Sequence, residues 1–325
     1  MSALLANVTR GDTIESQHYG HVAVVDRAGK LVLAFGDPQF VTYIRSAAKP
    51  FQAIPLYEDS VPDVFGFEDH EMAVIMSSHS GEERHVAAVN SILQKVGRSP
   101  ADLQCGVHVP LGQAVAGKLA AAGEKPTVLH NNCSGKHAGM IAACINRGWP
   151  VENYLAQNHP HQETILSILS RWAEIPREKL ALGIDGCSAP NFALPVFNMA
   201  RMYASLIASQ ETLHHRIVLA FVKHPEMIAG EDRFDTDIMR ATQGRILAKT
   251  GAEGIQCIAI DGPEPMGLAV KIVDGSARAV PAVVLAALEK LQAVSAKELE
   301  QLSRYRRVPQ RNHRELETGW IESAI

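Results

Sequence analysis

A serine and a lysine stand three residues apart in the segment Ser46-Ala-Ala-Lys49. On a helix, residues at this spacing lie on the same face, so the hydroxyl and the amine can meet. A serine hydroxyl becomes a useful nucleophile only when a base takes its proton, and a lysine can be that base only in its neutral form. The segment therefore predicts serine nucleophilic catalysis with a lysine base. Because this spacing occurs by chance in many chains, a helix-start serine beside a solvated lysine is the alternative interpretation.

Two further segments carry hydroxyl and amine groups in an order typical of serine acyl-enzyme amidases. Met76-Ser-Ser-His-Ser-Gly-Glu82 is a hydroxyl-rich loop, and Lys249-Thr-Gly251 comes shortly before a predicted strand. Together with the earlier serine–lysine spacing, this order matches the skeleton of amidases of the penicillin-binding type. The loop has a second interpretation, since Ser80 and Glu83 have the spacing of a capping box at a helix start.

Two cysteines in glycine-rich loops mark another candidate site. Cys133 and His137 lie in one loop, and Asp185 and Cys187 lie in the other. Buried structural cysteines usually have apolar neighbours, whereas these two have polar ones. Thiolate and nitrogen donors favour zinc over magnesium or calcium. The spacing fits no standard zinc knuckle, so two interpretations remain: a zinc site, or a polar active-site loop without metal.

The elements that must position these groups follow from the hydrophobic pattern. Short β-rich runs separated by turn residues predict a hairpin near the N-terminus and two strands near the C-terminus. Helical spacing dominates the middle of the chain, and a further helix is expected to start near Ser46. The expected strands are 21–25, 31–35, 255–260 and 266–273, and the expected helices are 83–96, 110–122, 163–175, 199–222 and 279–291.

This order of elements predicts an α+β protein that forms a single catalytic unit. Strands from both chain ends are expected to join one antiparallel sheet, with the helical middle as an inserted lobe. The expected sheet lobe comprises roughly residues 1–60 and 245–325, and the helical lobe roughly residues 61–244. No linker rich in proline, glycine and serine divides the chain, which favours a compact unit with a cleft between its lobes.

Composition excludes several classes of function. The chain has 325 residues, a formal net charge of −4 and five cysteines. Nucleic-acid binding requires a basic face, so the mildly acidic balance argues against it. No stretch approaches the roughly 18 to 20 apolar residues of a membrane span, and the N-terminus lacks the basic region of a signal peptide. We therefore expect a cytoplasmic protein, and an odd number of thiols suits that reducing compartment.

Five segments taken together have the pattern of a known enzyme family. They are Ser46-Ala-Ala-Lys-Pro-Phe-Gln52, Ser77-Ser-His-Ser-Gly-Glu82, Asn131-Asn-Cys-Ser-Gly-Lys-His-Ala-Gly-Met140, Asp185-Gly-Cys187 with Pro190, and Lys249-Thr-Gly-Ala-Glu-Gly254. In these segments the chain resembles the rhizobial-type L-asparaginases, also called class 3 or the asparaginase II family. The resemblance runs from about residue 10 to residue 290, and the third segment is its most specific part. It implies a fold similar to serine β-lactamases and glutaminases, and hydrolysis of L-asparagine to L-aspartate and ammonia.

The resemblance also implies two catalytic serine–lysine pairs. Ser46 with Lys49 is the first pair, and Ser78 with Lys249 is the second. Ser46 is our preferred nucleophile, because local helix geometry positions its lysine. A homodimer is implied as the assembly.

A zinc ion beside the serines is implied as well. Its ligands would be Cys133, Lys136 and Cys187, with water completing the coordination. A lysine amine must be neutral to donate a lone pair, so metal binding would depend on pH.

Residues near the substrate complete the implied site. Arg45, His137 and Asp185 would lie close to the substrate or the zinc. The chain departs from the family pattern at Asp235, where members often carry a cysteine. This departure bears on kinetic detail rather than on the class of reaction.

Other functions stay open at this point. A zinc-dependent amidohydrolase would use a metal-bound water, so Ser46→Ala would keep substantial activity while chelation would abolish it. A β-lactamase-like serine amidase or esterase would need room for a bulky acyl group, and the segment 131–139 has no counterpart there. A ligand sensor would keep the fold without turnover. Glutaminase activity is a further possibility, since one methylene in a pocket discriminates by only about 1–3 kcal/mol.

Overall fold

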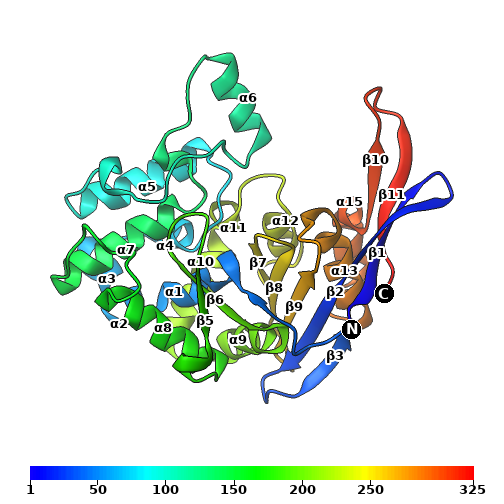
Figure 1. Cartoon of the computed structure of the whole chain (residues 1–325), viewed down its shortest axis with the longest axis horizontal. Helices are drawn as coiled ribbons and strands as arrows, with labels where there is room; N and C mark the ends of the chain where they lie inside the picture. Colours follow the sequence, from blue (N-terminus) through cyan, green and yellow to red (C-terminus); the bar gives the residue numbers. More distant parts are fainter. The chain divides into compact units, whose positions relative to one another are not determined.

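A computed structural model describes the whole chain, residues 1–325. The chain forms two compact units. The first comprises Met1–Ala47, Leu194–Ala208 and Asp237–Ile325, and the second comprises Ala48–Ala193 and Ser209–Thr236. The chain ends, drawn in blue and in orange to red in Figure 1, therefore belong to the first unit.

The first unit contains an antiparallel sheet whose strands come from both ends of the chain (Figure 1). Its eight strands are β1 (Ala3–Arg10), β2 (Thr13–Asp26), β3 (Leu31–Phe35), β7 (Ile246–Gly251), β8 (Ile255–Ile260), β9 (Met266–Ile272), β10 (Arg307–Arg311) and β11 (Glu317–Ser323). The strand order is β10-β11-β1-β2-β9-β8-β7, and β3 pairs with β2. This arrangement confirms the predicted α+β class with one antiparallel sheet drawn from both chain ends.

Helices cover this sheet closely because small residues allow it. The helix α9 (Val196–Ala208) packs against β9, β2 and β8. A Cβ atom at Gly267 of β9 would lie only 1.9 Å from the carbonyl oxygen of Ala200, so glycine is required at this contact. The helix α13 (Val280–Lys290) contacts β11, β9, β1 and β8. The apolar run of β8 is consequently buried along its whole length.

The remaining elements of the first unit are short, and three elements carry the chain from one unit into the other. The short elements are β4 (Val41–Tyr43), η5 (Ala277–Ala279), α14 (Ala296–Gln301) and α15 (Ser303–Arg306). The connecting elements are η1 (Arg45–Ala48), β6 (Pro190–Pro195) and α12 (Phe234–Ala241).

The second unit is mainly helical. Its elements are α1 (Lys49–Gln52), α2 (Ile54–Glu58), α3 (Val61–Phe65), α4 (Asp69–Ile75), α5 (Glu83–Lys95), η2 (Pro100–Asp102), α6 (Gln113–Ala121), η3 (Val128–His130), α7 (Ser134–Arg147), α8 (Pro160–Ala173), η4 (Arg177–Lys179), β5 (Ala181–Ile184), α10 (Thr212–Lys223) and α11 (Pro225–Ile228). The helices α4, α5 and α7 pack against one another, and β5 pairs with β6. No helix of the chain combines the length and the apolar character needed to cross a membrane.

Some elements differ from the sequence-based expectation. The single helical region expected over residues 199–222 is two helices, α9 and α10, with a break between them. In the break, the backbone N–H of Glu211 donates to Ser209 Oγ at 3.2 Å, and such local side-chain bonds compete with helix formation. The strands β1, β10 and β11 were not predicted. The sequences of β10 and β11 are largely polar and carry a weak strand signal. β1 pairs with β2 and β11, and β10 pairs with β11.

Candidate active site

Lys49 lies at the centre of the polar site in the second unit. It begins α1, and only 1% of its surface is exposed. Its Nζ atom donates to the carbonyl oxygen of Ser77, to Ser78 Oγ at 3.3 Å and to the carbonyl oxygen of Asn132 at 3.3 Å. One buried amine thus joins the start of α1, the serine-rich loop and the loop that precedes α7.

Local hydrogen bonds hold the serine-rich loop in place. Ser77 Oγ donates to the carbonyl oxygen of Val74, in the last turn of α4, at 2.7 Å. The backbone N–H of Ser78 donates to the carbonyl oxygen of Ile228 at 2.9 Å. The α7 residue Gly135 packs against the same turn, and a Cβ atom there would lie 2.1 Å from the Val74 carbonyl oxygen. Only a glycine lets α7 approach α4 this closely, which brings the start of α7 to the serine loop.

Ser46 lies in η1, three residues before Lys49, and is 8% exposed. The preceding residue, Arg45, has a φ of 54°, in the left-handed region that non-glycine residues rarely occupy. Such backbone strain costs about 1–3 kcal/mol and is concentrated at functional sites. The turn that carries Ser46 therefore begins at a strained backbone position.

Lys249 lies in β7 and is fully buried. Its Nζ atom donates to the carbonyl oxygen of Thr250 at 2.8 Å. In the sheet register it stands opposite Cys257 of β8. The K-T-G segment predicted to precede a strand is therefore the end of a strand itself.

The thiols of Cys133 and Cys187 are buried and close to each other, with Lys136 beside Cys187. The Lys136 Nζ atom lies 3.1 Å from Cys187 Sγ. The hydrogen bond from Cys187 and the nearby lysine ammonium groups lower the pKa of the Cys133 thiol well below its ordinary value, although burial opposes this. The neighbouring Cys133 and burial raise the pKa of Cys187. Cys133 also precedes the first turn of α7, where the helix dipole favours a thiolate.

The donor set at this thiol pair fits a zinc ion. Two sulfur atoms and one amine nitrogen meet in a buried position, and zinc prefers sulfur and nitrogen ligands. No group of three or more His, Cys, Asp and Glu side chains that could hold a metal occurs in the chain, so a three-donor set requires Lys136. Burial opposes the ammonium form of Lys136, but the neighbouring Cys187 and Cys133 raise its pKa overall. Metal binding would have to displace the Lys136 proton, which makes it pH-dependent.

His137 and Asp185 lie in the same unit as the thiol pair. His137 Nδ1 is 2.7 Å from the Tyr154 hydroxyl, and its buried Nε2 atom has no hydrogen-bond partner. Burial lowers the pKa of His137 well below its ordinary value, so the ring is neutral. Asp185 opens a tight turn in which the Ser188 N–H donates to its carbonyl oxygen at 2.8 Å, and its carboxylate contributes to the raised pKa of Lys136. Asp185 is therefore close enough to Lys136 for its charge to act on that amine.

The sequence did not reveal how Asn131 and Asn132 support this site. Asn131 Oδ1 accepts the backbone N–H of Cys133 at 2.8 Å, while its amide donates to the Cys105 carbonyl oxygen at 2.9 Å. The Asn132 carbonyl oxygen accepts from Lys49, which is 83 positions away. No spacing rule reaches across that separation. The only available signal was the position of both asparagines directly before the cysteine.

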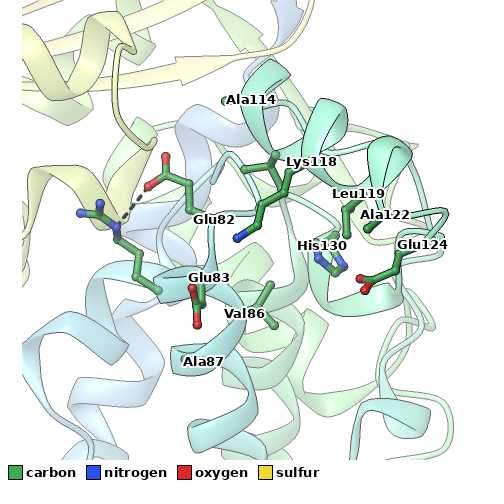
Figure 2. A pocket seen from close by; sticks show the side chains of 13 residues that line it. Glu82, Glu83, Val86, Ala87, Ala114, Lys118, Leu119, Ala122, Glu124 and His130 are labelled. Atoms are coloured by element: carbon green, nitrogen blue, oxygen red, sulfur yellow. Dashed lines mark ion pairs between the residues drawn. The ribbon is translucent and has the colours of Figure 1, made fainter.

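A cavity of about 940 Å³ lies beside the serine loop, between α6 and the start of α5 (Figure 2). Charged and apolar side chains both line it, among them Glu82, Lys118, Val86 and His130. Lys118 extends from α6 toward α5 (Figure 2). None of the residues predicted to do chemistry lines this cavity.

Comparison with known protein families gives a match that covers nearly the whole chain. A family model described as L-asparaginase II matches residues 6–323. No curated protein sequence matches the chain.

Several solved structures resemble the chain at low sequence identity. A beta-lactamase from Mycobacterium bovis is 15% identical at a TM-score of 0.43, covering 83% of this chain and 94% of that chain. Mglu in its native form is 17% identical at a TM-score of 0.37, covering 84% of this chain and 61% of that chain. Mglu in its tris and glutamate form is 16% identical at a TM-score of 0.38, covering 84% of this chain and 59% of that chain. This chain thus spans about three fifths of the length of these two Mglu chains.

Proposed function

Because this chain belongs to the L-asparaginase II family, we propose that it hydrolyses L-asparagine to L-aspartate and ammonia through a serine–lysine acyl-enzyme mechanism. The observation that carries this proposal is the buried contact between Lys49 Nζ and Ser78 Oγ, at 3.3 Å. A buried lysine amine beside a serine hydroxyl is the arrangement that base-assisted attack on an amide requires. The hydroxyl in this contact belongs to Ser78, and Ser46 is preferred as the nucleophile because it stands three residues before Lys49 in the chain.

In the proposed first step, Ser46 Oγ attacks the side-chain amide carbon of the substrate while Lys49 Nζ takes the hydroxyl proton. Lys49 can do this only as the neutral amine, so it must give up a proton before the attack. Backbone N–H groups, including that of Ser46, would hold the resulting oxyanion. Removing one such donor typically costs about 100- to 1,000-fold in rate.

In the proposed second step, the carbon–nitrogen bond breaks and the leaving nitrogen takes up a proton, so that ammonia departs. Ser78 and Lys249 are the groups that we assign to this proton transfer. A water molecule then attacks the aspartyl ester of Ser46 and transfers its proton to Lys49. Lys49 returns a proton to Ser46 Oγ as the ester bond breaks, and L-aspartate is released. The contact between Lys49 and Ser78 supports the role of Ser78, because it offers a direct proton path from the first base to the second serine.

Cys133, Lys136 and Cys187 are the residues that would hold a zinc ion. When bound, zinc supplies a Lewis-acid centre that orients polar groups of the substrate. The serine–lysine pairs provide the nucleophile and the bases, so a metal-bound hydroxide is not required. Holding the two cysteine loops together would be the main task of these three side chains.

Arg45, His137 and Asp185 are proposed to bind the amino and carboxylate groups of the substrate. The unpartnered Nε2 atom of His137 supports this role, since a buried ring nitrogen without a partner has hydrogen-bonding capacity to spare. The carboxylate of Asp185 can pair with the ammonium group of an amino acid, and the guanidinium of Arg45 can pair with its carboxylate.

Ammonia release from L-asparagine by the purified protein tests the proposal. L-Glutamine is measured in parallel, each with metal-free and zinc-supplemented protein. We expect asparagine turnover that persists, weakened, without zinc, and slower turnover of glutamine. Abolition of all turnover by chelation, with activity retained in Ser46→Ala, would instead support a zinc-dependent amidohydrolase. Size-exclusion chromatography with light scattering tests the homodimer that we propose as the assembly.

A further inference from the structure

The buried side chain of His79 connects the serine loop to the first turn of α7. The backbone N–H of Gly81 donates to His79 Nδ1 at 3.1 Å, which assigns the lone pair to that nitrogen. In the neutral ring, the proton is then on Nε2, which lies 2.9 Å from Ser134 Oγ. Ser134 in turn donates to the carbonyl oxygen of Leu129 at 2.9 Å. Every donor in this chain of hydrogen bonds therefore has an acceptor.

The surroundings of His79 keep this arrangement in one state. His79 and Ser134 are both fully buried. Burial is the main cause that holds the pKa of His79 well below its ordinary value, and the neighbouring His85 and Lys49 lower it further. The ring consequently stays neutral across the physiological range, with a donor and an acceptor at fixed positions.

The two ends of the His79 connection lie next to groups with proposed chemical roles. His79 directly follows Ser78, and Ser134 directly follows Cys133. The Ser134 backbone also donates to the carbonyl oxygen of Asn131 at 2.9 Å. A shift of the ring would therefore move the serine loop and the cysteine loop relative to each other.

We propose that His79 is a positioning residue, which holds Ser78 and Cys133 in register by bridging Gly81 and Ser134. This inference deepens the proposed function and rests on it for the role of Ser78. Its structural content, the coupling of the two loops, can be tested without any turnover. Partners that orient metal ligands typically contribute about 10- to 100-fold to metal affinity or activity.

The closing experiment separates the two bonds of the ring. His79→Asn keeps an acceptor near the Nδ1 position and loses the donor to Ser134, and Ser134→Ala removes the acceptor of that same bond. His85 provides the control. It is also fully buried and stacks on His79 with ring centroids 5.0 Å apart, but its Nδ1 and Nε2 bond to Glu82 and Glu226.

Two measurements on the metal-free chain provide the readout. One is Co²⁺ binding, followed by the thiolate-to-metal absorption band. The other is the rate of Cys133 alkylation by iodoacetamide, followed by peptide mass spectrometry. We expect His79→Asn and Ser134→Ala each to weaken Co²⁺ binding at least about tenfold and to change the Cys133 alkylation rate. The double variant should be little worse than either single variant, because both remove the same bond.

The control decides between positioning and general stability. His85→Gln should lower the melting temperature and leave both readouts within about twofold of the wild type, since its ring nitrogens bond to Glu82 and Glu226 and not to Gly81 or Ser134. Equal losses in His79→Asn and His85→Gln would overturn the proposal. If the wild-type chain took up no Co²⁺, the alkylation readout would decide by itself: an unchanged Cys133 alkylation rate in His79→Asn would overturn the proposal. If the protein does not hydrolyse asparagine, the proposed function is wrong, but the Co²⁺-binding and alkylation results still test the positioning role of His79.

Discussion

Lys49 Nζ lies 3.3 Å from Ser78 Oγ, although 29 positions separate the two residues in the chain. The sequence pattern assigned them to different serine–lysine pairs. Lys49 directly follows η1, which carries Ser46, and its amine also contacts Ser78 in the serine loop. The proposed proton transfers can therefore pass through one buried amine, and the predictions below follow from this arrangement.

Removing either member of the first pair should abolish turnover. Ser46→Ala removes the proposed nucleophile and Lys49→Met removes its base, so kcat for asparagine should fall at least about 10⁴-fold in each. Ser78→Ala should also lower kcat, but by less, because water can replace a hydroxyl in a proton path. Steady-state ammonia release measures all three. Near-normal turnover by Ser46→Ala would contradict the nucleophile assignment.

Loss of a cysteine from the thiol pair should weaken substrate binding more than it slows the chemistry. In Cys133→Ser the loops lose their shared ligand set while both serine–lysine pairs remain, so KM should rise by a larger factor than kcat falls. Cys144→Ser is the matched control. Cys144 lies in α7, the helix that Cys133 precedes; it is fully buried, and burial raises its pKa to about 12.

The Cys144 variant should keep its kinetic constants within about twofold. Its cost should be in stability, roughly 1–3 kcal/mol, because a hydroxyl would replace a thiol in an apolar setting. Full progress curves with asparagine, together with urea unfolding, separate the two effects. A large catalytic loss at Cys144 would show that the site is misplaced.

A single methyl group added at Gly135 should disrupt the site by forcing α7 away from α4. Its Cβ atom would lie 2.1 Å from the Val74 carbonyl oxygen, so α7 and the end of α4 would have to separate. We expect Gly135→Ala to lower the free energy of unfolding by about 1–3 kcal/mol and to lower kcat as well. Gly117→Ala in α6 is the control, since nothing lies within 4 Å of its added Cβ. That change should stabilise by about 0.5–1 kcal/mol. Equal stability of the two variants would contradict the close approach.

The buried residue His161 should make the protein less stable in mild acid. Burial lowers its pKa from 6.5 to about 4 in the folded chain. Between these values the unfolded chain binds more protons than the folded chain does. The free energy of unfolding therefore falls as the pH falls, by about 1.4 kcal/mol per pH unit for this group. The stabilisation is fully present above about pH 6.5 and is lost as the pH approaches 4.

Urea unfolding at pH 7 and pH 5 tests this sign. His161→Gln should reduce the difference in unfolding free energy between the two pH values by about 2 kcal/mol, since it removes one titrating group. His313→Gln, at an exposed position, should leave the difference unchanged. A pH dependence that is the same in His161→Gln as in the wild type would show that His161 does not cause it.

Much of the fold follows from local patterns in the sequence. The alternation and turn residues around His21 and Leu31 predicted a hairpin, which the pairing of β2 with β3 confirms. Runs of buried residues likewise predicted β8 and β9, and helical spacing predicted α5, α8 and α13 within a few residues. These signals are local because hydrophobic periodicity and turn chemistry act over only a few residues. The strands β10 and β11 escaped prediction because only their partners, far away in the sequence, make them strands.

The candidate chemistry divides in the same way. Residue types and motif order in the sequence predicted the family to which the chain belongs, and made Ser46, Lys49 and the cysteines of the two loops candidate site residues. Only the tertiary structure decided that Lys49 contacts Ser78 and Asn132, and that Lys136 lies against Cys187. Contacts between residues dozens of positions apart depend on how helices pack, as at Gly135 and Val74, where the absence of one side chain permits the approach. No periodicity within either segment encodes such a distance, because it belongs to the packed pair and not to either segment alone.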